Sequence, residues 1–125
     1  MKHLIEGLAV ATGGAAGALC RWVLSLVCGH LWPQFPVGTL VINLTGCFFL
    51  GWFVTAIGNR MVVSDVVRVG VAVGFVGAYT TFSTFMFESS ALWENGAFLK
   101  AITNVTGSIV LGLIAVRLGT YVGGR

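Results

Sequence analysis

One stretch decides the fold of this 125-residue chain: Gly74-Phe75-Val76-Gly77-Ala78-Tyr79-Thr80-Thr81-Phe82-Ser83-Thr84-Phe85-Met86-Phe87-Glu88. It lies inside an otherwise apolar run, yet it contains two glycines, a cluster of hydroxyl side chains and a carboxylate. Glycine weakens a helix and lets another backbone approach closely. Threonine and serine hydroxyls can bond backbone groups that a break has freed. The stretch therefore predicts a membrane-spanning helix that is broken near its middle.

The composition of the whole chain places it in a lipid bilayer. Only 9% of the residues are charged and 57% are hydrophobic, whereas a soluble domain carries about a quarter charged residues. The chain therefore cannot cover itself with a polar surface. Its seven lysines and arginines are scattered singly along the sequence. A nucleic-acid-binding protein would gather them into a patch or stripe, so that class is excluded.

Four apolar runs cover most of the sequence, at about 4–28, 37–57, 66–90 and 97–121. Each is long enough to cross a hydrocarbon core of about 30 Å as a helix. The turns between them are short and carry Pro, Gly, Asn or charged residues. We therefore predict an all-α membrane protein with a single four-span domain over residues 1–125. The basic residues give a modest preference for cytoplasmic termini.

The first run contains a small-residue motif and an arginine. Gly13-x-x-x-Gly17, with alanines around it, predicts a face for close helix packing. Arg21 has two interpretations that stay open. It is either an anchor whose side chain reaches the lipid headgroups or a residue of an aqueous vestibule.

Polar residues recur at helical spacing in two other runs. Thr39 and Asn43 lie one turn apart in the second run, and Asn104 and Ser108 lie one turn apart in the fourth. An asparagine inside a span needs a partner. It serves either as interhelical hydrogen-bond glue or as an amide N–H donor to an anion. From the residues alone, both roles stay open.

Motifs of enzymes and metal sites are missing from the sequence. There is no GxxxxGK, TVGYG or HExxH sequence, and no nucleophile–base pair is recognisable. The three cysteines have no CxxC spacing and the two histidines lie far apart, so we expect no zinc site. We expect a protein that is not an enzyme.

Three motifs together resemble a known family. They are Gly-Ala-x-x-Arg at 17–21, Gly-Thr-Leu-x-x-Asn-x-x-Gly at 38–46 and Gly-x-x-Gly-x-Tyr-Thr-Thr-Phe-Ser-Thr-Phe at 74–85. In these motifs the chain is similar to the Fluc-type fluoride channels, the small bacterial fluoride exporter family. The resemblance covers essentially the whole chain, although the fourth run matches less sharply.

This resemblance implies an antiparallel, dual-topology homodimer in the bacterial inner membrane, with two pores that export fluoride passively. Asn43 would donate to fluoride, and Phe82 and Phe85 would line the pores with their ring edges, which carry partial positive charge. Backbone carbonyls of the break from Gly77 to Thr80, from both subunits, would hold one structural Na⁺. Further candidates for the polar lining are Thr39, Thr81, Ser83, Thr84, Glu88, Asn104 and Ser108.

Two rival functions have different signatures. A small multidrug-type, proton-coupled antiporter is also a four-span homodimer, but it needs a carboxylate deep in a span. Residues 7–20 contain no acid, and Glu88 lies toward the end of its run. A non-transporting structural subunit would use its polar residues only for packing, and it predicts that Phe82→Ile leaves transport unchanged.

Overall fold

The computed structural model describes residues 1–125 and is entirely helical. Its elements are α1 (Lys2–Leu31), α2 (Val37–Asn59), α3 (Asp65–Val69), the π-helical η1 (Gly70–Val76), α4 (Gly77–Tyr79), α5 (Phe82–Glu94) and α6 (Phe98–Gly123).

Four helical segments are long and apolar enough to cross a membrane: α1, α2, the composite segment Asp65–Glu94 and α6. The predicted four spans are therefore confirmed. Each span ends a few residues beyond its predicted range, and the fourth begins one residue later than predicted. Helix α1, for example, continues to Leu31 because nothing stops it before Pro33, which disfavours helical backbone at Trp32.

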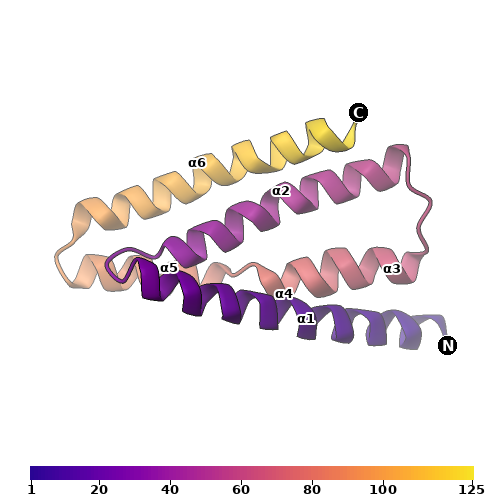
Figure 1. Ribbon diagram of the computed structural model, residues 1–125, viewed down its shortest axis with the longest axis horizontal. Helices are drawn as coiled ribbons and strands as arrows, with labels where there is room; N and C mark the ends of the chain where they lie inside the picture. Colours follow the sequence, from indigo (N-terminus) through magenta and orange to yellow (C-terminus); the bar gives the residue numbers. More distant parts are fainter.

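The helices form an elongated bundle with its turns at two opposite ends (Figure 1). Both termini and the connection from α2 to α3 lie at one end, whereas the turns after α1 and α5 lie at the other. Helix α2 packs mainly against α6, and α1 packs mainly against η1 and α4. This up-and-down arrangement is the one that four consecutive spans with short turns produce.

Glycines bring the helix backbones into direct contact. A Cβ atom on Gly13 would overlap the Gly70 carbonyl oxygen, and one on Gly17 would overlap the Phe75 carbonyl oxygen. On the other side of the bundle, a Cβ on Gly119 would overlap the Phe48 carbonyl oxygen. The predicted small-residue face of the first helix is thus confirmed, and η1 packs on it.

Helical backbone stops for two residues inside the third span. Thr80 has φ −79° and ψ 156°, and Thr81 has φ −148° and ψ 118°, both of which are extended. Figure 1 shows the non-helical connection between α4 and α5, which we call the interruption. The sequence placed the start of the break at Gly77, but Gly77 is helical with φ −61° and ψ −35°. A glycine lowers helix stability by only about 1 kcal/mol. Leaving a backbone group without a hydrogen bond in lipid costs several kcal/mol, so Gly77 stays helical.

Candidate functional site

The interruption lies against the N-terminal half of α2, where Asn43 binds it with both ends of its amide. The Asn43 Nδ2 group donates to the Thr81 carbonyl at 3.0 Å. The Thr81 N–H donates to the Asn43 Oδ1 atom at 2.8 Å. The side-chain amide thus offers Thr81 one acceptor and one donor, as a neighbouring strand would. Asn43 has the partner that a polar group inside a span requires.

Hydroxyl groups satisfy other backbone groups at the interruption. Thr81 is the N-cap of α5, and its Oγ1 atom accepts from the Thr84 N–H at 3.3 Å and donates to the Thr84 Oγ1 atom at 3.0 Å. The Thr80 Oγ1 group donates to the Val76 carbonyl at 2.9 Å. The Thr80 carbonyl oxygen accepts no hydrogen bond within the chain.

Helix ends of opposite polarity meet at the interruption. The carbonyl end of the helical segment that closes with α4 carries partial negative charge, and the amino end of α5 carries partial positive charge. One side of the interruption therefore favours a cation and the other favours an anion. Neither polarity depends on an ionised side chain.

Two phenylalanines stand next to the interruption on the first turn of α5. Phe82 and Phe85 have ring centroids 6.1 Å apart and an interplanar angle of 60°. Phe85 is buried with 6% of its surface exposed, whereas Phe82 is 74% exposed. Phe82, Asn43, Thr80 and Thr81 contribute to the lining of a pocket of about 240 Å³. The structure therefore brings Asn43, Thr81 and Phe82 together.

A second polar pair lies farther along the same helices. The Thr39 hydroxyl of α2 donates to the Glu88 Oε1 atom of α5 at 2.9 Å. The Glu88 Oε2 atom is buried and has no hydrogen-bond partner. Glu88 also borders a pocket of about 390 Å³ under the turn that joins α1 to α2. These two sequence candidates thus form one site between α2 and α5.

Asn104 of α6 belongs to a hydrogen-bonded chain with a residue that the sequence analysis missed. Its Nδ2 group donates to the Ser89 Oγ atom at 2.9 Å, and the Ser89 hydroxyl donates to the Phe85 carbonyl at 2.7 Å. Asn104 is only 2% exposed. Ser89 follows Phe85 by one helical turn, and this spacing was the signal that could have identified it.

The remaining candidates form no side-chain hydrogen bond with these pairs. Ser108 on α6 is half-buried, and Ser83 and Gly77 are exposed. Arg21 is half-buried and forms no ion pair or hydrogen bond. It lines a pocket of about 270 Å³ together with Thr81 and Thr84. Helix α1 therefore also borders the interruption.

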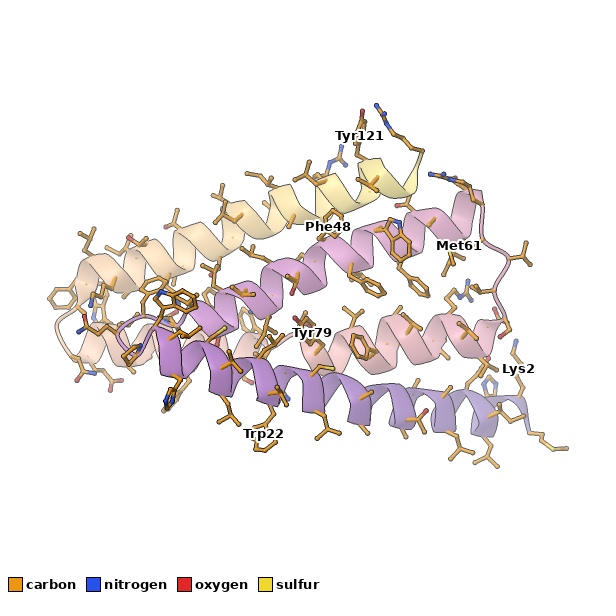
Figure 2. All side chains as sticks on the ribbon, viewed as in Figure 1. Lys2, Trp22, Phe48, Met61, Tyr79 and Tyr121 are labelled. Carbon is orange, nitrogen blue, oxygen red and sulfur yellow. The ribbon has the colours of Figure 1, made fainter.

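Tyr79 provides a further contact between the third span and α2. Its hydroxyl lies 2.8 Å from the Thr45 Oγ1 atom, and Figure 2 shows Tyr79 between α4 and α2. In the same view, Trp22 points away from the other helices. Tyr79 therefore faces inward next to the interruption, whereas Trp22 lies on the outside of the bundle.

The sequence matches one protein family over nearly its full length. The profile described as CrcB-like protein, Camphor Resistance (CrcB), matches residues 8–120. The chain is also similar to a protein of Methylococcus capsulatus named "Fluoride-specific ion channel FluC", with 48% identity over 118 residues. A protein of the same name from Hydrogenobaculum sp. is 41% identical over 117 residues. Another from Solibacter usitatus is 37% identical over 126 residues.

These relatives differ in length. The chain spans about half (52%) of the Methylococcus capsulatus protein. It spans 96% of the Hydrogenobaculum protein and 100% of the Solibacter usitatus protein. The matched part of the chain thus covers nearly the whole length of these two relatives.

Proposed function

The chain belongs to the CrcB-like family, and from this we propose that it is a fluoride-selective ion channel that lets F⁻ leave the cytoplasm passively. It is a multi-pass protein of the bacterial inner membrane, with four helices able to span the bilayer. A channel needs no energy source here. Hydrogen fluoride enters from acid surroundings and ionises inside the cell, and the membrane potential drives the anion out.

The observation that carries the proposal is the meeting of the Asn43 amide with Phe82 beside the extended backbone of Thr81. An asparagine amide has two N–H donors, and Thr81 uses one of them. The second is left for an ion. Ring edges add partial positive charge without a cation. Such a neutral site binds an anion weakly enough for it to leave, as conduction requires.

The proposed channel is an antiparallel homodimer with two pores. Phe82 is 74% exposed on the single chain, so a second copy of the chain can pack against the ring that lines the proposed pathway. A Cβ atom on Gly77 would meet nothing within 4 Å, so a second copy can approach the backbone there. Four helices do not by themselves enclose a pore, and a two-fold partner would supply the missing wall.

The residues at the interruption fit a structural Na⁺ on the two-fold axis. In an uninterrupted helix the Thr81 N–H would bind the Gly77 carbonyl, but here it donates to Asn43. The Thr80 carbonyl also accepts no hydrogen bond. Carbonyls of unwound backbone and helix carboxyl ends are typical Na⁺ ligands in membrane proteins. When bound, the ion would neutralise the two pairs of carbonyls and hold the copies together.

The channel is tested by fluoride efflux from liposomes. The purified protein is reconstituted into vesicles loaded with potassium fluoride, valinomycin is added, and external fluoride is followed with an electrode. We expect fast efflux, and no chloride efflux from matched chloride-loaded vesicles. The variant Asn43→Asp should abolish fluoride efflux, because a carboxylate replaces the remaining N–H donor. Thr45→Val is the matched control, since Thr45 contacts Tyr79 rather than Thr81.

Two results would contradict the proposal. If vesicles that contain folded protein release no fluoride, the proposal that the protein is a channel is wrong. Equal rates of fluoride and chloride efflux would show that the channel is not selective for fluoride. Unchanged efflux through Asn43→Asp would remove Asn43 from the pathway but leave the channel function standing.

A further inference from the structure

We propose that Asn43 has two separable roles: its amide oxygen positions the backbone that holds Na⁺, and its free N–H group serves fluoride. This inference rests on the proposed function, because the sodium site belongs to the proposed dimer. It goes further by making one side chain of α2 a positioning residue for an ion that it does not touch.

The argument begins with the backbone of the third span. A helix that continued through Thr81 would pair the Thr81 N–H with the Gly77 carbonyl. In the structure this N–H donates to the Asn43 Oδ1 atom at 2.8 Å, and Thr81 is only 8% exposed. Water therefore does not replace Asn43 at this N–H. Without Asn43, the Thr81 N–H is left unpaired in an apolar setting or returns to Gly77.

The second step concerns the carbonyls. If the Thr81 N–H returns to the Gly77 carbonyl, that oxygen is engaged inside the helix. The same change makes Thr80 helical and turns its carbonyl away from its present direction. Both proposed Na⁺ ligands then lose their positions together. The Asn43 oxygen therefore acts on the ion through the Thr81 peptide.

The third step separates the two ends of the amide. Only Oδ1 accepts from Thr81, and only Nδ2 can donate. Aspartate keeps the acceptor for the Thr81 N–H but loses both N–H donors, the free one and the one bound to the Thr81 carbonyl, whereas leucine of similar size also loses the acceptor. The two substitutions should therefore divide the effects on sodium from the effects on fluoride.

The test measures how Na⁺ raises the thermal stability of the purified protein in detergent. NaCl is titrated against N-methylglucamine chloride at constant ionic strength, and the half-saturating concentration is recorded beside fluoride efflux. For Asn43→Leu we expect a half-saturating Na⁺ concentration roughly 10–100-fold higher, the usual loss when a residue that orients metal ligands is removed. For Asn43→Asp we expect a concentration equal to or below that of the unmodified protein, and no fluoride efflux. Thr45→Val, which loses a different contact between α2 and the third span, should leave it unchanged.

The outcomes separate the inference from the channel itself. Fluoride efflux by the unmodified protein without any response to Na⁺ overturns the inference and leaves the channel standing. If Asn43→Asp loses the Na⁺ response, the acceptor alone does not hold the backbone and the two roles are not separable, whether or not Asn43→Leu folds. If Asn43→Leu folds and keeps its Na⁺ response, the side chain only donates to fluoride. Absence of fluoride efflux in the unmodified protein refutes the channel, while the sodium titrations still test the positioning role.

Discussion

Replacing Gly17 with alanine tests one of the close helix contacts of the molecule, that between α1 and η1. A Cβ atom there would overlap the Phe75 carbonyl oxygen and lie 3.0 Å and 3.1 Å from its carbonyl carbon and Cα. All three atoms are backbone, so no side chain can turn aside, and α1 must move away from η1. Forcing extra volume into a packed interface costs about 1–3 kcal/mol. Gly7→Ala is the matched control, because a Cβ on Gly7 meets nothing within 4 Å.

The two variants share the same gain in helix propensity, about 1 kcal/mol for glycine to alanine. The difference in their free energies of unfolding therefore reports the packing alone. We expect Gly17→Ala to be about 1–3 kcal/mol less stable than Gly7→Ala. Unfolding in mixed detergent micelles with increasing dodecyl sulfate, followed by tryptophan fluorescence, measures both. Equal stability of the two variants would refute the close contact between α1 and η1.

Three further predictions concern the polar sites and the aromatic pair. Phe82→Ile and Phe85→Ile should both reduce fluoride efflux. Only Phe85→Ile should also lower the stability of the chain, because Phe85 is 6% exposed and Phe82 is 74% exposed; full efflux through Phe82→Ile would show that the Phe82 ring is not part of the fluoride pathway. Asn104→Leu should lower the free energy of unfolding by about 0.6–2 kcal/mol, the range for one hydrogen bond between membrane helices. An unchanged free energy in the same unfolding assay would show that the bond to Ser89 does not stabilise the chain. Thr39→Val should reduce efflux by removing the hydroxyl donor to Glu88, and Thr39→Ser should restore it; equal rates in both variants would exclude the hydroxyl.

The sequence was sufficient for the number and kind of helices, because apolar length and low charge leave few alternatives in a membrane. It did not identify which helices pack together. The pairing of α2 with α6 depends on Gly119 meeting the backbone at Phe48, residues that are far apart in the chain. The glycine motif of α1 showed that a close neighbour exists, but nothing in the sequence named η1 as that neighbour.

The polar residues were found as a set, but the sequence did not show which of them pair across helices. Asn43 was expected to be either packing glue or an ion donor, and its two bonds to Thr81 show that it has a structural partner 38 positions away. Such a contact leaves no periodic signal. Ser89 was missed because its one-turn spacing from Phe85 was not considered, and the spacing alone does not name Asn104 as its second partner. The role of these residues in conduction stays a prediction.

The interruption of the third span also explains why a cation is expected beside an anion pathway. Each unsatisfied backbone group inside a membrane costs several kcal/mol, and the chain satisfies the groups of Thr81 and the N–H of Thr84 with its own side chains. The Thr80 carbonyl is one of the groups it leaves without a partner. No side-chain substitution at Thr80 removes that carbonyl, so titrating Na⁺ on the unmodified protein is the direct measurement. Stabilisation by Na⁺ that K⁺ and N-methylglucamine do not reproduce would identify a specific ligand for the carbonyl, and equal stability in all three salts would mean that something other than sodium satisfies it.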